Sequence, residues 1–217
     1  LNPYRLAWAY LDHLQAEERG DADDGERALL RRMVVQGVNT PWTSSAGRLF
    51  DAVSALLGVR SRVTYEAEAA IALEMLAEAD PAGVVYPYEV RETGAPLTWG
   101  RAPAHRGPAL EILLKPLFEA LVADQEAGTP TGIISHRFHR TLAAWAADLA
   151  VRIASEAGID RVALSGGCFQ NHLLLRLTIQ ALQARGLTVL VHRQVPCNDG
   201  GLSLGQVAVA QSVAGGA

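Results

Sequence analysis

The sequence predicts an α/β protein with a helix-rich first part, residues 1–157, and a C-terminal β-α-β-α unit, residues 158–217. Apolar residues recur at helical spacing through most of the first part. In the last part, two short apolar segments, RVALS and LTVLVHR, each precede a glycine-containing loop and a helical segment. This alternation of strand and helix predicts a parallel pair of strands joined by a right-handed crossover.

Six helices are expected in the first part, followed by two in the last. Gly37 and Gly58 stand just past the second and third helices, where glycine supplies a left-handed cap. Ser44 or Ser45 is the expected N-cap of the third helix, whose buried face comprises Leu49, Val53, Leu56 and Leu57. Between residues 80 and 107, short alternating pieces such as VVYPYEV predict a hairpin or an edge strand. The expected helices of the first part are residues 1–20, 26–36, 45–58, 65–78, 111–123 and 135–157.

Composition excludes several classes of protein. The net charge of −4 and the pI near 5.9 give no electrostatic reason to bind nucleic acid or an anionic membrane. The longest apolar run, near residues 173–175, is too short to span a bilayer, and the N-terminus does not resemble a signal peptide. Two cysteines are too few for a disulfide framework or a four-thiolate zinc site. A cytoplasmic protein with a small-molecule or protein partner is expected.

The beginning of the chain predicts that the sequence is a fragment. It does not start with Met, and its first residues already have the apolar spacing of a helix. We therefore expect an upstream half of the domain to be missing.

The loops SGGCFQN and VPCNDGG follow the two strands of the last part. Ligands of parallel α/β units bind beyond the carboxyl ends of the strands, so both loops should converge on one crevice. Gly166 and Gly167 have no Cβ, which lets the backbone approach a phosphate and point N–H groups at it. Asn171, one turn later, can donate a hydrogen bond to the same ligand or accept one from it. Tight packing of helix on strand is the alternative explanation of the glycines.

The second loop places a carboxylate at this crevice. Asp199 lies between Asn198 and the pair Gly200–Gly201, where a cation bridging phosphates, or a transition metal, would sit. Asp51 and Glu66 are candidates for binding ribose hydroxyls. A solvated helix face is the alternative for both.

The remaining reactive side chains leave alternatives open. Cys168 is either a thiolate nucleophile at a helix N-terminus or, as we favour, a small buried thiol, and the same choice applies to Cys197. His136 and His139 lie three residues apart on one helix and could bind a metal. Arginines flank them and no carboxylate is near in sequence, so packing or capping is favoured.

Five segments in order resemble a known family: NTPWTSSAGRLFDAVSALLG, YEAEAAIALE, RFHRTLA, LSGGCFQNHLLL and HRQVPCNDGGLSLGQ. They look like the C-terminal, carbamoyl-transferring domain of HypF-type NiFe-hydrogenase maturation proteins. That domain is similar to the tRNA threonylcarbamoyltransferase and to antibiotic O-carbamoyltransferases. The resemblance implies an actin/Hsp70-like (RNase H-like) fold, of which this chain would be the second half.

The resemblance also implies a reaction. In the family, an upstream domain makes carbamoyl-adenylate from carbamoyl phosphate and ATP. This domain then transfers the carbamoyl group to a C-terminal cysteine thiol of a partner maturation protein, for the cyanide ligands of the hydrogenase. Carried onto this sequence, Asp199 and Asn171 would be catalytic, and Asp199 would also be a metal ligand. The phosphate and nucleoside would contact the residues Ser165, Gly166, Gly167, Asn171, Asp51, Glu66, Gly200 and Gly201.

The sequence departs from the family at several points. The family's metal site also uses a closely spaced histidine pair from the half that would precede Leu1. Cys168 and Cys197 replace a usual Val and Pro. The fragment alone is therefore expected to be inactive. Two other functions stay open: an O-carbamoyltransferase of small-molecule biosynthesis and a non-catalytic nucleotide-binding module.

Overall fold

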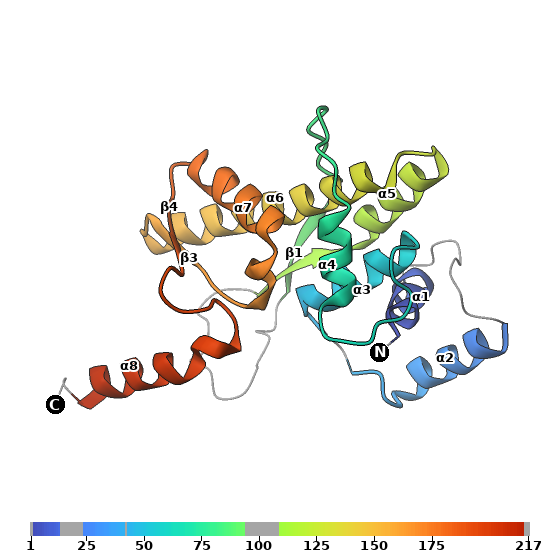
Figure 1. The fold of residues 1–217 in the computed structure, drawn as a ribbon, viewed down its shortest axis with the longest axis horizontal. Helices are drawn as coiled ribbons and strands as arrows, with labels where there is room; N and C mark the ends of the chain where they lie inside the picture. The colour runs from blue at the N-terminus through green and yellow to red at the C-terminus, as the bar shows by residue number, and fades with distance from the viewer. Residues whose placement is uncertain (1, 14–23, 42, 94–108, 215–217) are drawn as a thin grey trace.

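The computed structural model describes residues 2–13, 24–41, 43–93 and 109–214. The helices and strands of these ranges follow one another along the chain (Figure 1). The first part contains α1 (Pro3–His13), α2 (Asp24–Gln36), α3 (Ala46–Leu56), α4 (Glu68–Met75), β1 (Glu89–Thr93), β2 (Ala109–Leu113), α5 (Lys115–Glu126) and α6 (Thr131–Ala157). The last part contains β3 (Arg161–Leu164), α7 (His172–Gln183), β4 (Thr188–Val191) and α8 (Leu202–Ala214), with short 3-10 helical turns at Gly167–Gln170 and Asp199–Gly201.

The last part has the predicted parallel topology. Strands β3 and β4 pair in parallel, with Leu164 opposite Val191, and α7 connects them. Both strands therefore end at the same edge, and the two glycine loops leave from it. The other pair in the described residues is antiparallel, with Glu89 of β1 opposite Leu113 of β2.

One apolar core joins the two parts of the chain. It contains side chains of α1, α3, α5, α6 and α7, among them the fully buried Leu11, Leu117 and Phe138. The ring of Phe50 on α3 meets that of Phe138 on α6 edge to face, at 5.1 Å between centroids. The long α6 runs through the molecule, with α7 packed along it (Figure 1). Leu174 and Leu177 of α7 belong to this core, whereas the strands pack on a second apolar cluster centred on Ala147, Leu164 and Leu182.

Glycine and N-cap signals gave the correct ends of several helices. Gly37 and Gly58, just past α2 and α3, have φ of +67° and +72°. Ser45 is the N-cap of α3, since its Oγ accepts a hydrogen bond from the N–H of Arg48 at 3.4 Å. The four expected apolar residues of α3 are buried. The predicted end of the first helix at Gly20 lies outside the described residues, as does most of the excursion at residues 94–107.

Helix α4 is shorter than the predicted helix over residues 65–78. The carboxylate of Glu68 accepts hydrogen bonds from the N–H of Thr64 at 2.7 Å and from its hydroxyl at 3.0 Å. Ala67 has a left-handed φ of 62°, so a continuous helix cannot run through it. At the other end, the N–H of Glu78 bonds to the carbonyl of Gly132 at the start of α6 instead of continuing α4. Tertiary contacts thus set both ends of this helix.

The predicted helix over residues 111–123 is wrong in its first turn. Glu111–Leu113 belongs to β2, and α5 starts at Lys115. Pro116 at the first turn suits a helix start, because its missing N–H would have no intrahelical partner there. The strand pairing with β1 outweighs the helical periodicity of these residues.

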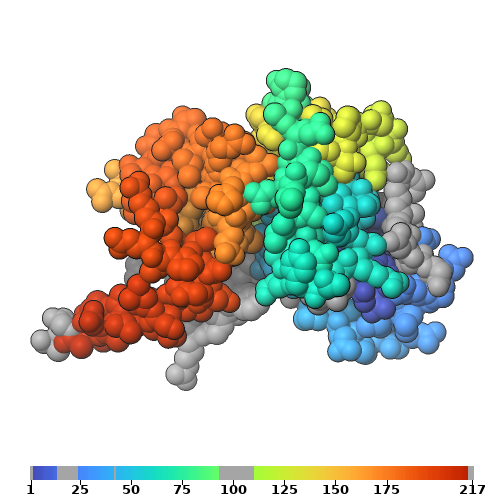
Figure 2. All heavy atoms as spheres, viewed as in Figure 1, coloured from blue at the N-terminus to red at the C-terminus, as the bar shows by residue number. Residues whose placement is uncertain are grey.

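Helix α8 projects away from the rest of the molecule (Figures 1 and 2). None of its described residues is buried, although it contains Leu204, Val209 and Val213, which are 55%, 63% and 72% exposed. An apolar helix with this exposure is typical of a surface that another part of a protein covers. No helix of the described ranges combines the length and apolar character that a membrane crossing needs.

Candidate functional site

The two glycine loops are in direct contact. The N–H of Gly166 donates a hydrogen bond to the carbonyl of Cys197, with 2.7 Å between N and O. These residues lie in the loops that follow β3 and β4. The predicted convergence of the loops at one crevice is therefore confirmed.

The first loop leaves room for a ligand at its glycines. Gly166 has φ +104°, a conformation that side-chain-bearing residues rarely adopt, and a Cβ at Gly166 or Gly167 would meet no atom within 4 Å. The turn is closed by two backbone bonds, Phe169 N–H to Gly166 O and Asn171 N–H to Cys168 O. Within the described ranges, the N–H groups of Gly167 and Cys168 form no backbone hydrogen bond. The turn therefore offers free donors beside open space, as an anion-binding backbone requires.

Asn171 ends this turn, and protein groups already bind its side chain. Its Oδ1 accepts from the N–H of Leu174 at 2.8 Å, which makes it the N-cap of α7. Its Nδ2 lies 2.9 Å from Nε2 of His139 on α6. The residue is buried, with only 9% of its surface exposed. Asn171 first of all holds the turn against α6, and its direct contact with a phosphate stays a prediction.

The second loop presents Asp199 to solvent. Asp199 is exposed at the start of a 3-10 turn, and the side chain of the preceding Asn198 accepts from the N–H of Gly200 at 3.1 Å. A Cβ on Gly201 would lie 2.7 Å from the carbonyl oxygen of Pro196, so this glycine is needed for the fold of the loop. In the described part of the chain, no three His, Cys, Asp or Glu side chains gather into a metal-binding group. Asp199 can supply one carboxylate ligand, and a metal would need further ligands from elsewhere.

Ser165 and His192 form a polar pair that the sequence analysis missed. The Oγ of Ser165, just after β3, lies 2.9 Å from Nε2 of His192, just after β4. Both residues are exposed. Ser165 directly follows RVAL, and His192 directly follows LTVLV. Parallel strands end at the same edge, so these positions could have identified the pair.

Asp51 and Glu66 lie in different surroundings. Asp51 is buried on α3, 8% exposed, with one carboxylate oxygen 3.0 Å from Nη1 of Arg48. Burial raises the pKa of the Asp51 carboxyl, and the charge of Arg48 opposes this shift. Glu66 is exposed in the turn before α4. No contact between either carboxylate and the glycine loops is recorded in the described residues, so their roles at a nucleoside stay predictions.

The start of α3 does lie beside the first loop. The thiol of Cys168 interacts with the backbone of Gly47 in the first turn of α3, and it packs against the main core. Burial raises the pKa of this thiol, and the Gly47 contact only partly opposes the shift. A raised pKa disfavours the thiolate, so the structure supports the interpretation of Cys168 as a packing thiol, although it is only half-buried.

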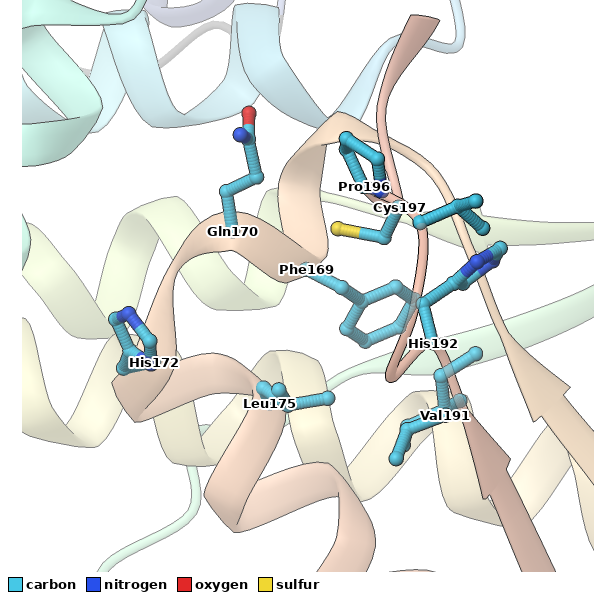
Figure 3. A pocket seen from close by; sticks show the side chains of 10 residues that line it. Phe169, Gln170, His172, Leu175, Val191, His192, Pro196 and Cys197 are labelled. Atoms are coloured by element: carbon cyan, nitrogen blue, oxygen red, sulfur yellow. The ribbon is translucent and has the colours of Figure 1, made fainter. Parts of the chain in front are cut away.

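Cys197 lines a hollow next to the loops (Figure 3). The hollow has a volume of about 330 Å³, and the ring of Phe169 forms part of its wall. Gln170, His172 and His192 supply its polar side chains. Its walls are formed by residues of both loops and by the start of α7, whereas Gly166, Gly167 and Cys168 do not line it.

His139 has no nitrogen free for a metal. It is fully buried, with Nδ1 2.7 Å from the carbonyl oxygen of Ser135 and Nε2 bonded to Asn171. His136 is 6% exposed, and its Nδ1 is buried without a hydrogen-bond partner. The structure therefore supports packing, rather than metal binding, as the role of His139.

Burial of His139 predicts a loss of stability in acid. Burial lowers the pKa of this imidazole to about 4, from an ordinary 6.5. Below pH 6.5 this imidazole is protonated in the unfolded chain but stays neutral in the folded chain. The free energy of unfolding therefore decreases as the pH falls toward 4, by about 3 kcal/mol in all. Denaturant unfolding at pH 7 and pH 5 should show about 2 kcal/mol of this loss.

The variant His139→Gln is the control for this prediction. It cannot titrate at this position, so its stability should depend less on pH between 7 and 5. Burial also lowers the pKa of His136, and that contribution should remain in the variant. An equal pH dependence in both proteins would contradict the assignment to His139.

Comparison with known proteins identifies the family. Residues 1–206 match the family described as "Carbamoyltransferase, Kae1-like Domain, second subdomain". The chain belongs to the HypF carbamoyltransferases. It is 39% identical over 228 residues to "Carbamoyltransferase HypF2" of Cupriavidus necator, covering 96% of this chain and 27% of that protein. It is 38% identical over 176 residues to "Carbamoyltransferase HypF" of Synechocystis, covering 81% of this chain and 20% of that protein.

Solved HypF structures have the same fold as this chain. A full-length HypF in its phosphate- and nucleotide-bound form superposes with a TM-score of 0.78 and 33% identity, over 97% of this chain and 26% of that one. The HypF of T. kodakarensis gives a TM-score of 0.71 and 26% identity, over 95% of this chain and 24% of that one. The chain thus spans about a quarter of the length of these HypF proteins.

Proposed function

We propose that this chain is the second half of a carbamoyl-transfer domain with the actin/Hsp70-like fold. In this proposal the domain moves the carbamoyl group of carbamoyl-adenylate to the C-terminal cysteine thiol of a partner hydrogenase maturation protein. The observation that carries the proposal is the joined pair of glycine loops, with free N–H groups beside open space at Gly166 and Gly167. A HypF relative solved with phosphate and nucleotide bound supports it.

The backbone of the first loop performs the binding step in this proposal. The N–H groups of Gly167 and Cys168 would bind phosphate oxygens of the adenylate. The partner's thiolate attacks the carbamoyl carbon, a C–S bond forms, and the bond from that carbon to the phosphate oxygen breaks as AMP leaves. The thiol proton passes to solvent. Donors aimed at the charge that develops on the oxygens lower the barrier, because they stabilise the transition state more than the bound substrate.

A cation at the second loop would complete the site. Asp199 is exposed, and within the described ranges its hydrogen bond is made by its backbone carbonyl, which accepts from the N–H of Leu202. Its carboxylate is therefore free to be a ligand. A bound divalent or transition metal ion would neutralise phosphate charge. The other ligands would come from outside this chain.

The chain spans about a quarter of the length of the HypF proteins it matches. Helix α8 exposes Val209 and Val213, whose burial against another part of the protein would remove apolar surface from water. We propose that an upstream part of a longer polypeptide covers α8 and supplies the missing ligands. Carbamoyl transfer is then a property of the complete polypeptide.

The test is a transfer assay with the complete polypeptide. Carbamoyl phosphate, ATP and the partner protein are mixed, and mass spectrometry of the partner's C-terminal peptide is expected to show a carbamoylated cysteine. A partner whose terminal cysteine is replaced by serine is the control. ATP binding without modification of the partner would contradict the proposal and favour a non-catalytic module, whereas carbamoylation of a small-molecule hydroxyl would favour an O-carbamoyltransferase.

A further inference from the structure

His139 connects three helices to the glycine turn through an unbroken set of hydrogen bonds. Its Nδ1 lies 2.7 Å from the carbonyl oxygen of Ser135, one turn earlier on α6. Its Nε2 lies 2.9 Å from Nδ2 of Asn171, whose Oδ1 accepts from the N–H of Leu174 on α7 at 2.8 Å. The hydroxyl of Ser135 donates to the carbonyl of Leu73 on α4 at 2.6 Å.

Backbone partners at both ends determine where every proton lies. The carbonyl of Ser135 can only accept, so the imidazole carries its proton on Nδ1. The N–H of Leu174 can only donate, so Oδ1 of Asn171 faces it and Nδ2 faces His139. Nδ2 is a donor, and Nε2 must therefore be an unprotonated acceptor. The arrangement admits one form of His139, the neutral ring with the proton on Nδ1.

The imidazole is held tightly in this orientation. It is fully buried, and its ring meets the ring of Phe50 on α3 at 5.2 Å and that of the neighbouring Phe138 at 5.8 Å between centroids. Asn171, its polar partner, closes the glycine turn through the bond from its N–H to the carbonyl of Cys168 at 3.2 Å. The position of the turn relative to α6 is thereby tied to the orientation of one ring.

We infer that His139 is a positioning residue, which as a neutral Nδ1–H imidazole orients Asn171 and so aims the free N–H groups of the glycine turn. The expected effect of His139 on activity rests on the proposed function, whereas the hydrogen bonds that His139 forms are independent of it. Without the acceptor at Nε2, the buried amide of Asn171 would lose a partner, and the turn would shift to recover one. The donors at Gly167 and Cys168 would then no longer match the transition state.

The first test reads the tautomer directly. Nitrogen NMR of the 217-residue chain, labelled at histidine, distinguishes a protonated from an unprotonated ring nitrogen. At pH 7, His139 is expected to show a proton on Nδ1 and none on Nε2. In Asn171→Asp, one carboxylate oxygen can still cap α7 while the other faces Nε2, so His139 is expected to become doubly protonated. An Nε2–H tautomer in the parent chain, or a neutral ring in the variant, would overturn the inference.

The second test separates hydrogen bonding from packing, in the complete polypeptide. His139→Phe keeps an aromatic ring beside Phe50 and removes both hydrogen bonds, whereas His139→Gln retains an amide oxygen that can accept from Asn171. We expect kcat for carbamoyl transfer to fall about tenfold or more in the Phe variant, with a smaller change in KM, and to recover largely in the Gln variant. Equal activity in the two variants, whether high or low, would overturn the positioning role.

The outcomes of these tests also distinguish this inference from the proposed function. If the unmodified polypeptide transfers no carbamoyl group, the proposed function fails, while the NMR result still decides the hydrogen-bond network. If His139→Phe does not fold, as judged by lost helical circular dichroism, the comparison of the unmodified protein with Asn171→Asp by NMR remains decisive.

Discussion

Gly167→Val is expected to abolish carbamoyl transfer in the complete polypeptide while leaving its fold unchanged. A Cβ at Gly167 meets no protein atom within 4 Å and the residue has no left-handed φ, so the added side chain enters the open space where a phosphate would bind. The loss in kcat/KM should reach about 100-fold or more, as for removal of an oxyanion donor. Helical circular dichroism and thermal unfolding should change little.

Two matched variants test whether the loss comes from filling the space at Gly167. Ala163→Val adds a branched side chain to an exposed residue of β3, three residues before Gly166, and should keep full activity. Gly167→Ala adds only a methyl group and should give an intermediate loss. By contrast, Gly166 has φ +104°, so its replacement would strain the backbone as well. Normal transfer by the Gly167→Val variant would show that no phosphate approaches this turn.

Asp199→Asn is expected to stop carbamoyl transfer and release bound metal from the complete polypeptide, without unfolding it. The side chain is exposed, so its charge contributes little to the fold. A neutral amide is a far weaker ligand than a carboxylate for a hard cation. The isolated chain should purify without stoichiometric metal, since it offers only this one matched ligand. Elemental analysis of the three proteins measures the metal content, and mass spectrometry of the partner's C-terminal peptide measures the transfer.

The control for this prediction is Asp160→Asn. Asp160 is another exposed aspartate, 3.6 Å from Nε of Arg161 at the opposite end of β3 from the glycine loop. Its replacement should change neither metal content nor transfer. Stoichiometric metal in the isolated chain that persists in Asp199→Asn would place the metal site elsewhere, with His136 the first residue to test because His139 has both nitrogens engaged.

Local signals were enough to predict the β-α-β-α unit and its loops. A strand needs only a short apolar run, as in RVALS, and a helix end needs only a glycine that tolerates positive φ, as at Gly37 and Gly58. Both signals can be read from neighbouring residues. The convergence of the loops followed from the parallel order, because parallel strands end at one edge. The same logic could have identified His192 beside Ser165.

Other features required the packing of distant segments. Residues 111–113 are strand because β1 lies beside them, and α4 is short because of the contact of Glu78 with Gly132. Helical periodicity cannot report either contact.

His139 shows most clearly the difference between what the sequence determines and what the packing determines. From the sequence, His139 was a candidate metal ligand or a packing residue, and Asn171 a phosphate ligand. The sequence by itself determined that Asn171 stands between a glycine turn and a helix. Only the packing of α6 against α7 brings His139, 32 residues away, to the amide of Asn171. A hydrogen bond between buried side chains depends on the relative placement of two helices, which is set by the whole apolar core and not by the residues next to either partner.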